Sequence, residues 1–122
     1  MKVTCVKLPT LPGGEQPVET RWIGVDTDYQ VISLIAQPDG RVVFHVVTDD
    51  ARYLAWFDSV YFRVADGRLP STWRARIHED GMLELAPAAW LVDGFWERYY
   101  ESDASAVDAV EHELRLLTGS DP

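Results

Sequence analysis

The chain has one cysteine, Cys5, no asparagine and only two lysines among its 122 residues. A single cysteine excludes an internal disulfide. No apolar run approaches the roughly 20 residues that a membrane-spanning helix needs. The stretch between Lys2 and Lys7 is too short for the apolar region of a signal peptide. We therefore expect a cytoplasmic protein, and nine arginines without any asparagine indicate GC-rich codons and a bacterial source.

The composition is otherwise that of one globular domain. Hydrophobic residues make up 47% of the chain and charged residues 25%, and a chain of this length can build one hydrophobic core. We find no internal repeat and no domain boundary, so we expect residues 1–122 to form a single domain. Residues 9–20 contain three prolines and two adjacent glycines, which predict a flexible loop.

The first of two predicted β-hairpins surrounds a three-residue turn at 38–40. The turn ends in a glycine, which tolerates the left-handed conformation that this loop type needs. Strands over 29–37 and 41–47 would then set Leu34 opposite Phe44 and Ile32 opposite Val46. Both faces of this hairpin are largely apolar, which is typical of central strands that are covered at least in part on both sides.

The second hairpin surrounds the turn at 79–81. Pairing residues 72–78 with 82–86 sets Ile77 opposite Leu83, and we expect both side chains to point inward, because a shift by one residue would mix the faces. Further strands are predicted over 2–8 and 60–65. The sequence thus indicates a mainly antiparallel sheet of about five to six strands.

After Pro87 the spacing of apolar residues changes to that of a helix. We expect a helical segment over 88–118, with a short turn at 88–92 and a second start near Gly94. The last helix should begin at Ser102 or Asp103, both good N-cap residues. Strands followed by helices indicate an α+β fold in which two C-terminal helices pack on the sheet.

The net charge of −9 is concentrated near the end of the chain. Residues 93–122 hold eight acidic residues and two arginines, whereas residues 1–92 hold 12 acidic and nine basic residues. A negative field repels nucleic acid and anionic membranes and attracts basic proteins. We therefore expect a basic protein partner, no nucleic acid and no membrane.

Motifs of catalysis and metal binding are absent from the sequence. No EF-hand, HExxH, CxxC or P-loop spacing occurs, so we expect no catalytic residue, no metal and no cofactor. Ser33 and His45 share one face of the first hairpin. They are the candidates for the alternative function, a small-molecule binding domain or minor enzyme with a pocket on that face.

Five tryptophans are a high count for this length, and we expect Trp73, Trp90 and Trp96 at the junction of sheet and helices. Residues 61–117 contain DGRLPSTW at 66–73, then Pro87, Trp90 and GFWERYY at 94–100. This stretch, about half of the chain, resembles small acidic immunity-type proteins of bacterial toxin–immunity systems. The resemblance implies a non-enzymatic protein that binds one cognate toxin, often a basic nuclease, and blocks its active site.

Charge, aromatic residues and resemblance together predict an immunity- or antitoxin-type protein that neutralises a basic toxin through an acidic, aromatic-rich face. The expected binding residues lie on the two C-terminal helices: Trp96, Glu97, Tyr100, Glu101, Asp108 and Glu111. A third hypothesis is a homodimer that buries the aromatic residues of this face.

Overall fold

The structure, a computed structural model, describes residues 1–8, 22–50 and 53–118. In these residues seven strands form an antiparallel sheet, and two helices follow it, which confirms the α+β fold. The loop predicted at 9–20 lies outside the described residues. The elements in chain order are β1 Lys2–Cys5, β2 Asp28–Ala36, β3 Val42–Val47, β4 Leu54–Asp58, the 3-10 turn η1 Ser59–Tyr61, β5 Phe62–Asp66, β6 Trp73–Ile77, β7 Leu83–Pro87, the 3-10 turn η2 Ala88–Leu91, α1 Phe95–Tyr100 and α2 Ala104–Thr118.

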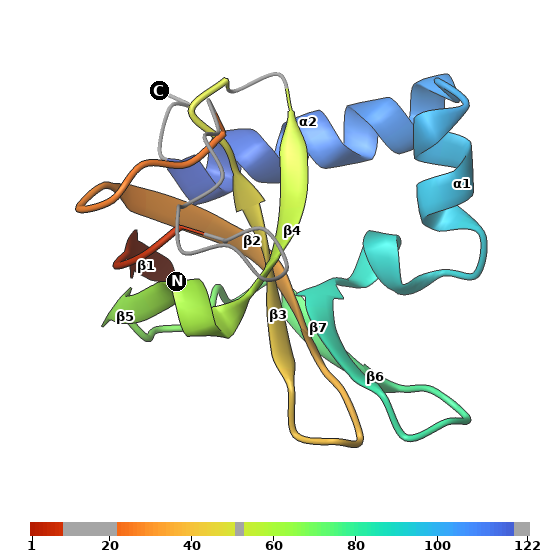
Figure 1. Cartoon of the computed structure of the whole chain (residues 1–122). Coiled ribbons are helices and arrows are strands. Elements are labelled where there is room, and N and C mark those ends of the chain that lie inside the picture. The colour runs from red at the N-terminus through yellow and green to blue at the C-terminus, as the bar shows by residue number, and fades with distance from the viewer. Residues whose placement is uncertain (9–21, 51–52, 119–122) are drawn as a thin grey trace.

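The long strand β2 is the centre of the sheet (Figure 1). Along one edge it pairs with β3, which in turn pairs with β4. Along its other edge, the first part of β2 pairs with β1 and the last part with β7. Because β5 extends the sheet beyond β1 and β6 extends it beyond β7, the sheet divides into two arms that share β2.

A β-bulge in β2 changes the face on which one core residue lies. From Ser33 to the turn the register with β3 is as predicted, but the predicted pairing of Ile32 with Val46 is wrong, because Val31 takes that place. The extra residue of a bulge re-aims the side chains around it. Ile32 is consequently fully buried on the helical side of the sheet, in a cluster that includes Trp90.

The second hairpin has the predicted register, with Ile77 opposite Leu83. The expectation that both side chains point inward is wrong for Ile77, which is 75% exposed. The strand predicted over 60–65 is β5, and its Val64 is also half exposed. The physical reason is that the helices cover only one face of this part of the sheet.

Two hydrophobic clusters hold the fold together, one on each side of the sheet. The helical cluster joins β2 and β7 to the helices, and its buried residues are Ile32, Ala86, Trp90, Phe95, Ala106 and Val110. The other cluster joins β1 and β5 to β2 and β3. Trp73 belongs to this second cluster rather than to the junction with the helices, so that expectation is wrong.

Local residues fix where the two helices begin. Gly94 has a φ of 78°, a left-handed conformation that suits glycine, and α1 begins directly after it. Asp103, one of the two expected caps, accepts a hydrogen bond from the backbone N–H of Ala106 at 3.1 Å and so caps α2. In Figure 1, α2 runs across one end of the sheet and α1 lies beside it.

Candidate functional site

The acidic residues predicted to bind a partner lie on the outside of α1 and α2. Glu97, Tyr100 and Glu101 belong to α1 and the residue that follows it, and Asp108 and Glu111 to α2. All five are exposed, and the two helices pack on each other. We call these five residues the acidic helical surface.

Trp96, the sixth predicted residue, is only partly exposed. Its ring packs edge-on against Trp90 at 5.4 Å and Phe95 at 5.2 Å, measured between ring centroids. Because the ring of Trp96 also contacts His45 of β3, with ring centroids 5.0 Å apart, it fixes α1 on the sheet. Tyr100 lies 6.2 Å from Trp96 and is 65% exposed, so it is the aromatic residue of this surface that a partner can reach.

The four carboxylates of the acidic helical surface make no ion pair within the described parts of the chain. Burial raises the pKa of Tyr99, and the neighbouring Tyr100 and Glu111 raise it further. The surface thus offers uncompensated negative charge next to an exposed aromatic ring, an arrangement that suits a cationic protein surface.

The alternative site residues, Ser33 and His45, lie side by side beneath α1. Ser33 Oγ is 3.2 Å from His45 Nδ1, and Trp56 stacks on the imidazole. Burial lowers the pKa of His45 to about 3, so the ring is neutral at neutral pH. Both side chains are fully buried, and Trp96 makes a second ring contact with the imidazole. A ligand could reach them only after Trp56 or Trp96 moved.

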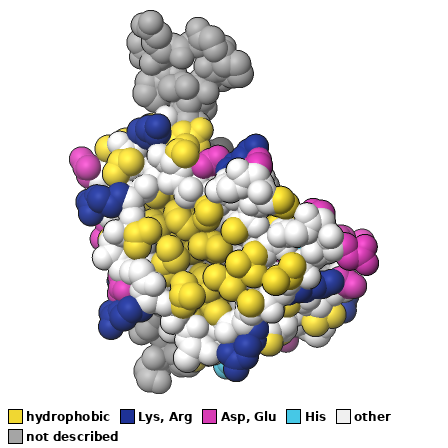
Figure 2. Space-filling view, turned by 90° about the horizontal axis from the view of Figure 1, so that it is seen from below, with side chains coloured by type: hydrophobic (Ala, Val, Ile, Leu, Met, Phe, Trp, Pro, Cys, Tyr) yellow, Lys and Arg dark blue, Asp and Glu magenta, His cyan; other side chains and the backbone are white. Residues whose placement is uncertain are grey.

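The face of the sheet that the helices leave uncovered forms a second surface, which the sequence analysis did not predict. Figure 2, seen from the side opposite α2, shows a broad apolar area bordered by charged side chains. We call it the apolar sheet face; its residues include Leu34, Val42, Phe44, Phe62, Val64, Ile77 and Leu83. The signal was present in the sequence, because both hairpin faces are apolar whereas two short helices can cover only one.

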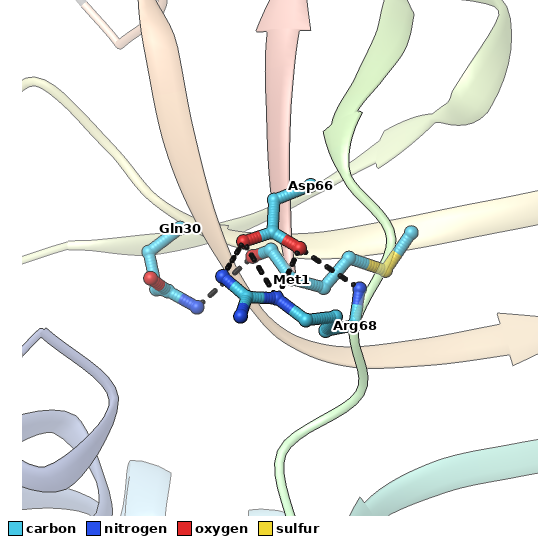
Figure 3. A network of polar contacts seen from close by, with 4 residues as sticks. All are labelled: Met1, Gln30, Asp66 and Arg68. Atoms are coloured by element: carbon cyan, nitrogen blue, oxygen red, sulfur yellow. Dashed lines mark hydrogen bonds and ion pairs between the residues drawn. The ribbon is translucent and has the colours of Figure 1, made fainter.

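A hollow of about 570 Å³ lies between the start of β1, the segment after β5 and the end of α2. The guanidinium and then the backbone N–H of Arg68 donate to Asp66 and hold the pKa of that carboxyl well below its usual range (Figure 3). Beside them Gln30 Nε2 donates to the Met1 carbonyl oxygen at 2.9 Å. These contacts neutralise the Arg68 charge and fasten β2 to β1, so we read them as structural.

In the described ranges, no three His, Cys, Asp or Glu side chains are grouped as a metal site requires. No helix of the described residues has the length and apolarity needed to cross a membrane. Comparison with protein-family models, with curated proteins and with solved structures found no match for this chain. The function must therefore be argued from the two surfaces themselves.

Proposed function

We propose that this chain is a non-enzymatic, immunity- or antitoxin-type protein that neutralises a basic toxin through the acidic helical surface. One observation carries the proposal: the two packed helices carry four exposed carboxylates without an ion pair in the described residues, together with the exposed ring of Tyr100. Surface carboxylates that lack internal partners keep their charge available to a partner.

The carboxylates and the aromatic ring would do different work in such a complex. Long-range attraction from the acidic residues raises the rate of association, and most of it is lost in high salt. Tyr100 supplies a rigid anchor of the residue type that dominates binding energy at interfaces. Trp96 packs on Trp90 and Phe95 and keeps α1 in place. The helix that carries Tyr100 and Glu97 is therefore already ordered before binding, which lowers the entropy cost of association.

A growth assay tests this proposal. Immunity genes are expected beside the gene of their toxin, so the gene upstream in the source genome supplies the partner. The toxin domain, expressed in a bacterial host, should stop growth, and co-expression of this chain should restore it. A variant with Glu97, Glu101, Asp108 and Glu111 all changed to lysine should fail to restore growth, although its circular dichroism spectrum stays that of the unchanged protein.

The matched control is Glu79→Lys. Glu79 is an exposed glutamate in the turn of the second hairpin, and it makes no ion pair in the described residues. Its charge reversal should leave the rescue intact. Absence of a toxin gene beside this one, or rescue by the fourfold variant as complete as by the unchanged protein, would contradict the proposal.

A further inference from the structure

The hollow of about 570 Å³ is lined by both apolar and charged side chains. They come from the start of β1, from β2, from the segment after β5 and from the end of α2, and we call the site the β1–α2 hollow. Pockets for small molecules have volumes of a few hundred Å³, apolar walls and a few polar groups that orient the ligand. The β1–α2 hollow has this size and this mixture of side chains.

Lys2 is the charged side chain of this lining that has no partner. Three charged side chains line the hollow: Lys2, Asp66 and Arg68. Lys2 lies opposite Asp66 in the register of β1 with β5, but Arg68 Nε and Nη2 donate to the Asp66 carboxylate at 3.0 and 2.7 Å. Lys2 is exposed and makes no ion pair within the described residues. Two positive charges and one negative charge leave this lining with a surplus of one positive charge, in a chain whose net charge is −9.

Two more groups of the lining can donate to an anion. Figure 3 shows the third guanidinium nitrogen of Arg68 without a contact among the residues drawn, and the Arg68 side chain is 90% exposed. The hydroxyl of Ser71 is exposed as well. Thr72, by contrast, donates its hydroxyl proton to Glu113 Oε2 at 3.2 Å, so one carboxylate already borders the hollow. A ligand with a single negative charge matches this arrangement, whereas a second negative charge would be repelled by Glu113.

The apolar part of the lining includes two exposed leucines. Leu69, after β5, is 52% exposed and Leu116, in α2, is 47% exposed, and both line this hollow. Pro70 and Leu117 extend the apolar wall and are partly buried. Single exposed apolar residues are common on protein surfaces, but these two come from separate segments of the chain and line the same hollow. A ligand that covers them removes their apolar surface from water, which favours binding.

From this combination we propose that the β1–α2 hollow binds a small organic monocarboxylate with an aliphatic or aryl body. The carboxylate accepts hydrogen bonds from Lys2 Nζ and from the free donors of Arg68 and Ser71. The body of the ligand packs on Leu69 and Leu116. The proposal does not depend on the proposed function, because no residue of the acidic helical surface lines the hollow.

Nuclear magnetic resonance titration of the full, isotope-labelled chain tests the proposal. The probe is 4-phenylbutyrate, which should shift the backbone amide signals of Lys2, Ser71 and Leu116 in a saturable way. Two probes with the same body, 4-phenylbutan-1-ol and 4-phenylbutylamine, should bind at least about fivefold more weakly, because they lack the carboxylate. Inorganic phosphate should also bind more weakly, because it has no apolar body and carries a second negative charge.

Variants of the lining separate the charge from the apolar wall. Lys2→Gln should weaken binding of 4-phenylbutyrate at least about fivefold, and Lys2→Arg, which keeps the charge, should stay within about threefold of the unchanged protein. Leu69→Ser should weaken binding about threefold or more, because less apolar surface is covered. Both residues are exposed, so these variants should fold, and dispersed amide signals would verify it.

The matched controls are Lys7→Gln and Ile77→Ser. Lys7 is the other lysine of the chain, and Ile77 is an exposed aliphatic residue; neither lines the hollow. Both variants should bind 4-phenylbutyrate as the unchanged protein does. These controls show whether a loss of binding comes from the hollow itself or from a general change in surface charge and hydrophobicity.

Four results would overturn the proposal. These are the absence of saturable shifts at the hollow, equal binding of the alcohol, equal binding of inorganic phosphate, and a Lys2→Gln variant that binds as well as the unchanged chain. A tighter complex with acetylglycylleucine, whose carboxylate is that of a peptide terminus, would assign the hollow to the C-terminus of a protein instead of a small acid.

Discussion

Trp56 of β4 stacks on His45 of β3, with ring centroids 4.0 Å apart and ring planes inclined by 12°. The imidazole also makes a T-shaped contact with Trp96, with ring centroids 5.0 Å apart, and Ser33 Oγ lies 3.2 Å from its Nδ1. Nε2 is buried and has no hydrogen-bond partner among the residues that the structure describes. None of these three neighbours carries a charge, so a protonated imidazole would be buried with nothing to compensate it.

Acid should therefore destabilise the fold through His45. Burial lowers its pKa from 6.5 to about 3 in the folded protein, so between these values the unfolded chain binds a proton that the folded chain does not. The free energy of unfolding keeps this contribution above pH 6.5 and loses it as the pH falls toward 3, by up to about 1.4 kcal/mol per pH unit. Denaturant titrations across this pH range measure the slope.

Carboxylates also titrate in this range, so the comparison needs a variant without the imidazole. His45→Gln should show a smaller loss of stability with falling pH than the unchanged protein, and His45→Phe serves if the first variant does not fold. Parallel pH profiles for the unchanged protein and the variant would refute the role of His45.

The bulge in β2 makes a second prediction. Ile32 is fully buried against the helices, whereas Ile77 is exposed on the uncovered face. Ile32→Ala should lower the free energy of unfolding by about 2–5 kcal/mol, the range for buried aliphatic residues. Ile77→Ala should change it by no more than about 0.5 kcal/mol. Similar losses for both variants in urea denaturation would show that the two residues are equally buried.

A third prediction concerns the N-cap of α2. Asp103 accepts hydrogen bonds from the Ser105 hydroxyl and from the Ala106 backbone N–H, and these two contacts lower its pKa. Asp103→Ala should reduce stability by about 1 kcal/mol, whereas Asp103→Asn keeps the acceptor and should lose less. Asp108→Ala, within α2 and exposed, is the control and should be nearly neutral. Equal stability of Asp103→Ala and Asp108→Ala would contradict the capping role.

Much of the fold follows from local rules. The turns at 38–40 and 79–81, the hairpin registers next to them and the Asp103 cap were predictable, because each depends on residues close in sequence. The bulge at Ile32 was not, since the alternating pattern of β2 is apolar on both faces and tolerates either placement. The exposure of Ile77 depends on which face two short helices cover, a tertiary choice that no local pattern encodes.

The candidate site was predictable only in part. Exposed charge on an amphipathic helix can be located from spacing, and Glu97, Glu101, Asp108 and Glu111 are indeed exposed. Spacing cannot separate an aromatic anchor from an aromatic core residue. Spacing predicts the same role for Trp96 and Tyr100, which are four residues apart, yet the packing of Trp96 on Trp90 leaves only Tyr100 well exposed.

Tyr100 yields the fourth prediction. Tyr100→Ala should weaken binding of the toxin partner at least tenfold, because Tyr100 is the exposed tyrosine of the acidic helical surface and tyrosine is enriched among the residues that dominate interface binding energy. The same change should leave the free energy of unfolding within about 0.5 kcal/mol, since most of the ring is in solvent. Val92→Ala, another exposed residue near α1, should alter neither quantity. If the Tyr100→Ala variant bound the toxin partner with unchanged affinity, Tyr100 would not be an anchor of the interface.

The salt dependence of association tests the central claim most directly. Stopped-flow mixing of this chain with its purified toxin partner gives the association rate constant at low and at high ionic strength. If the acidic helical surface steers the complex, the constant should fall at least tenfold between about 0.01 and 0.5 M salt. The fourfold lysine variant should be slow even at low salt. A rate constant that is the same at both ionic strengths, for both proteins, would contradict the account.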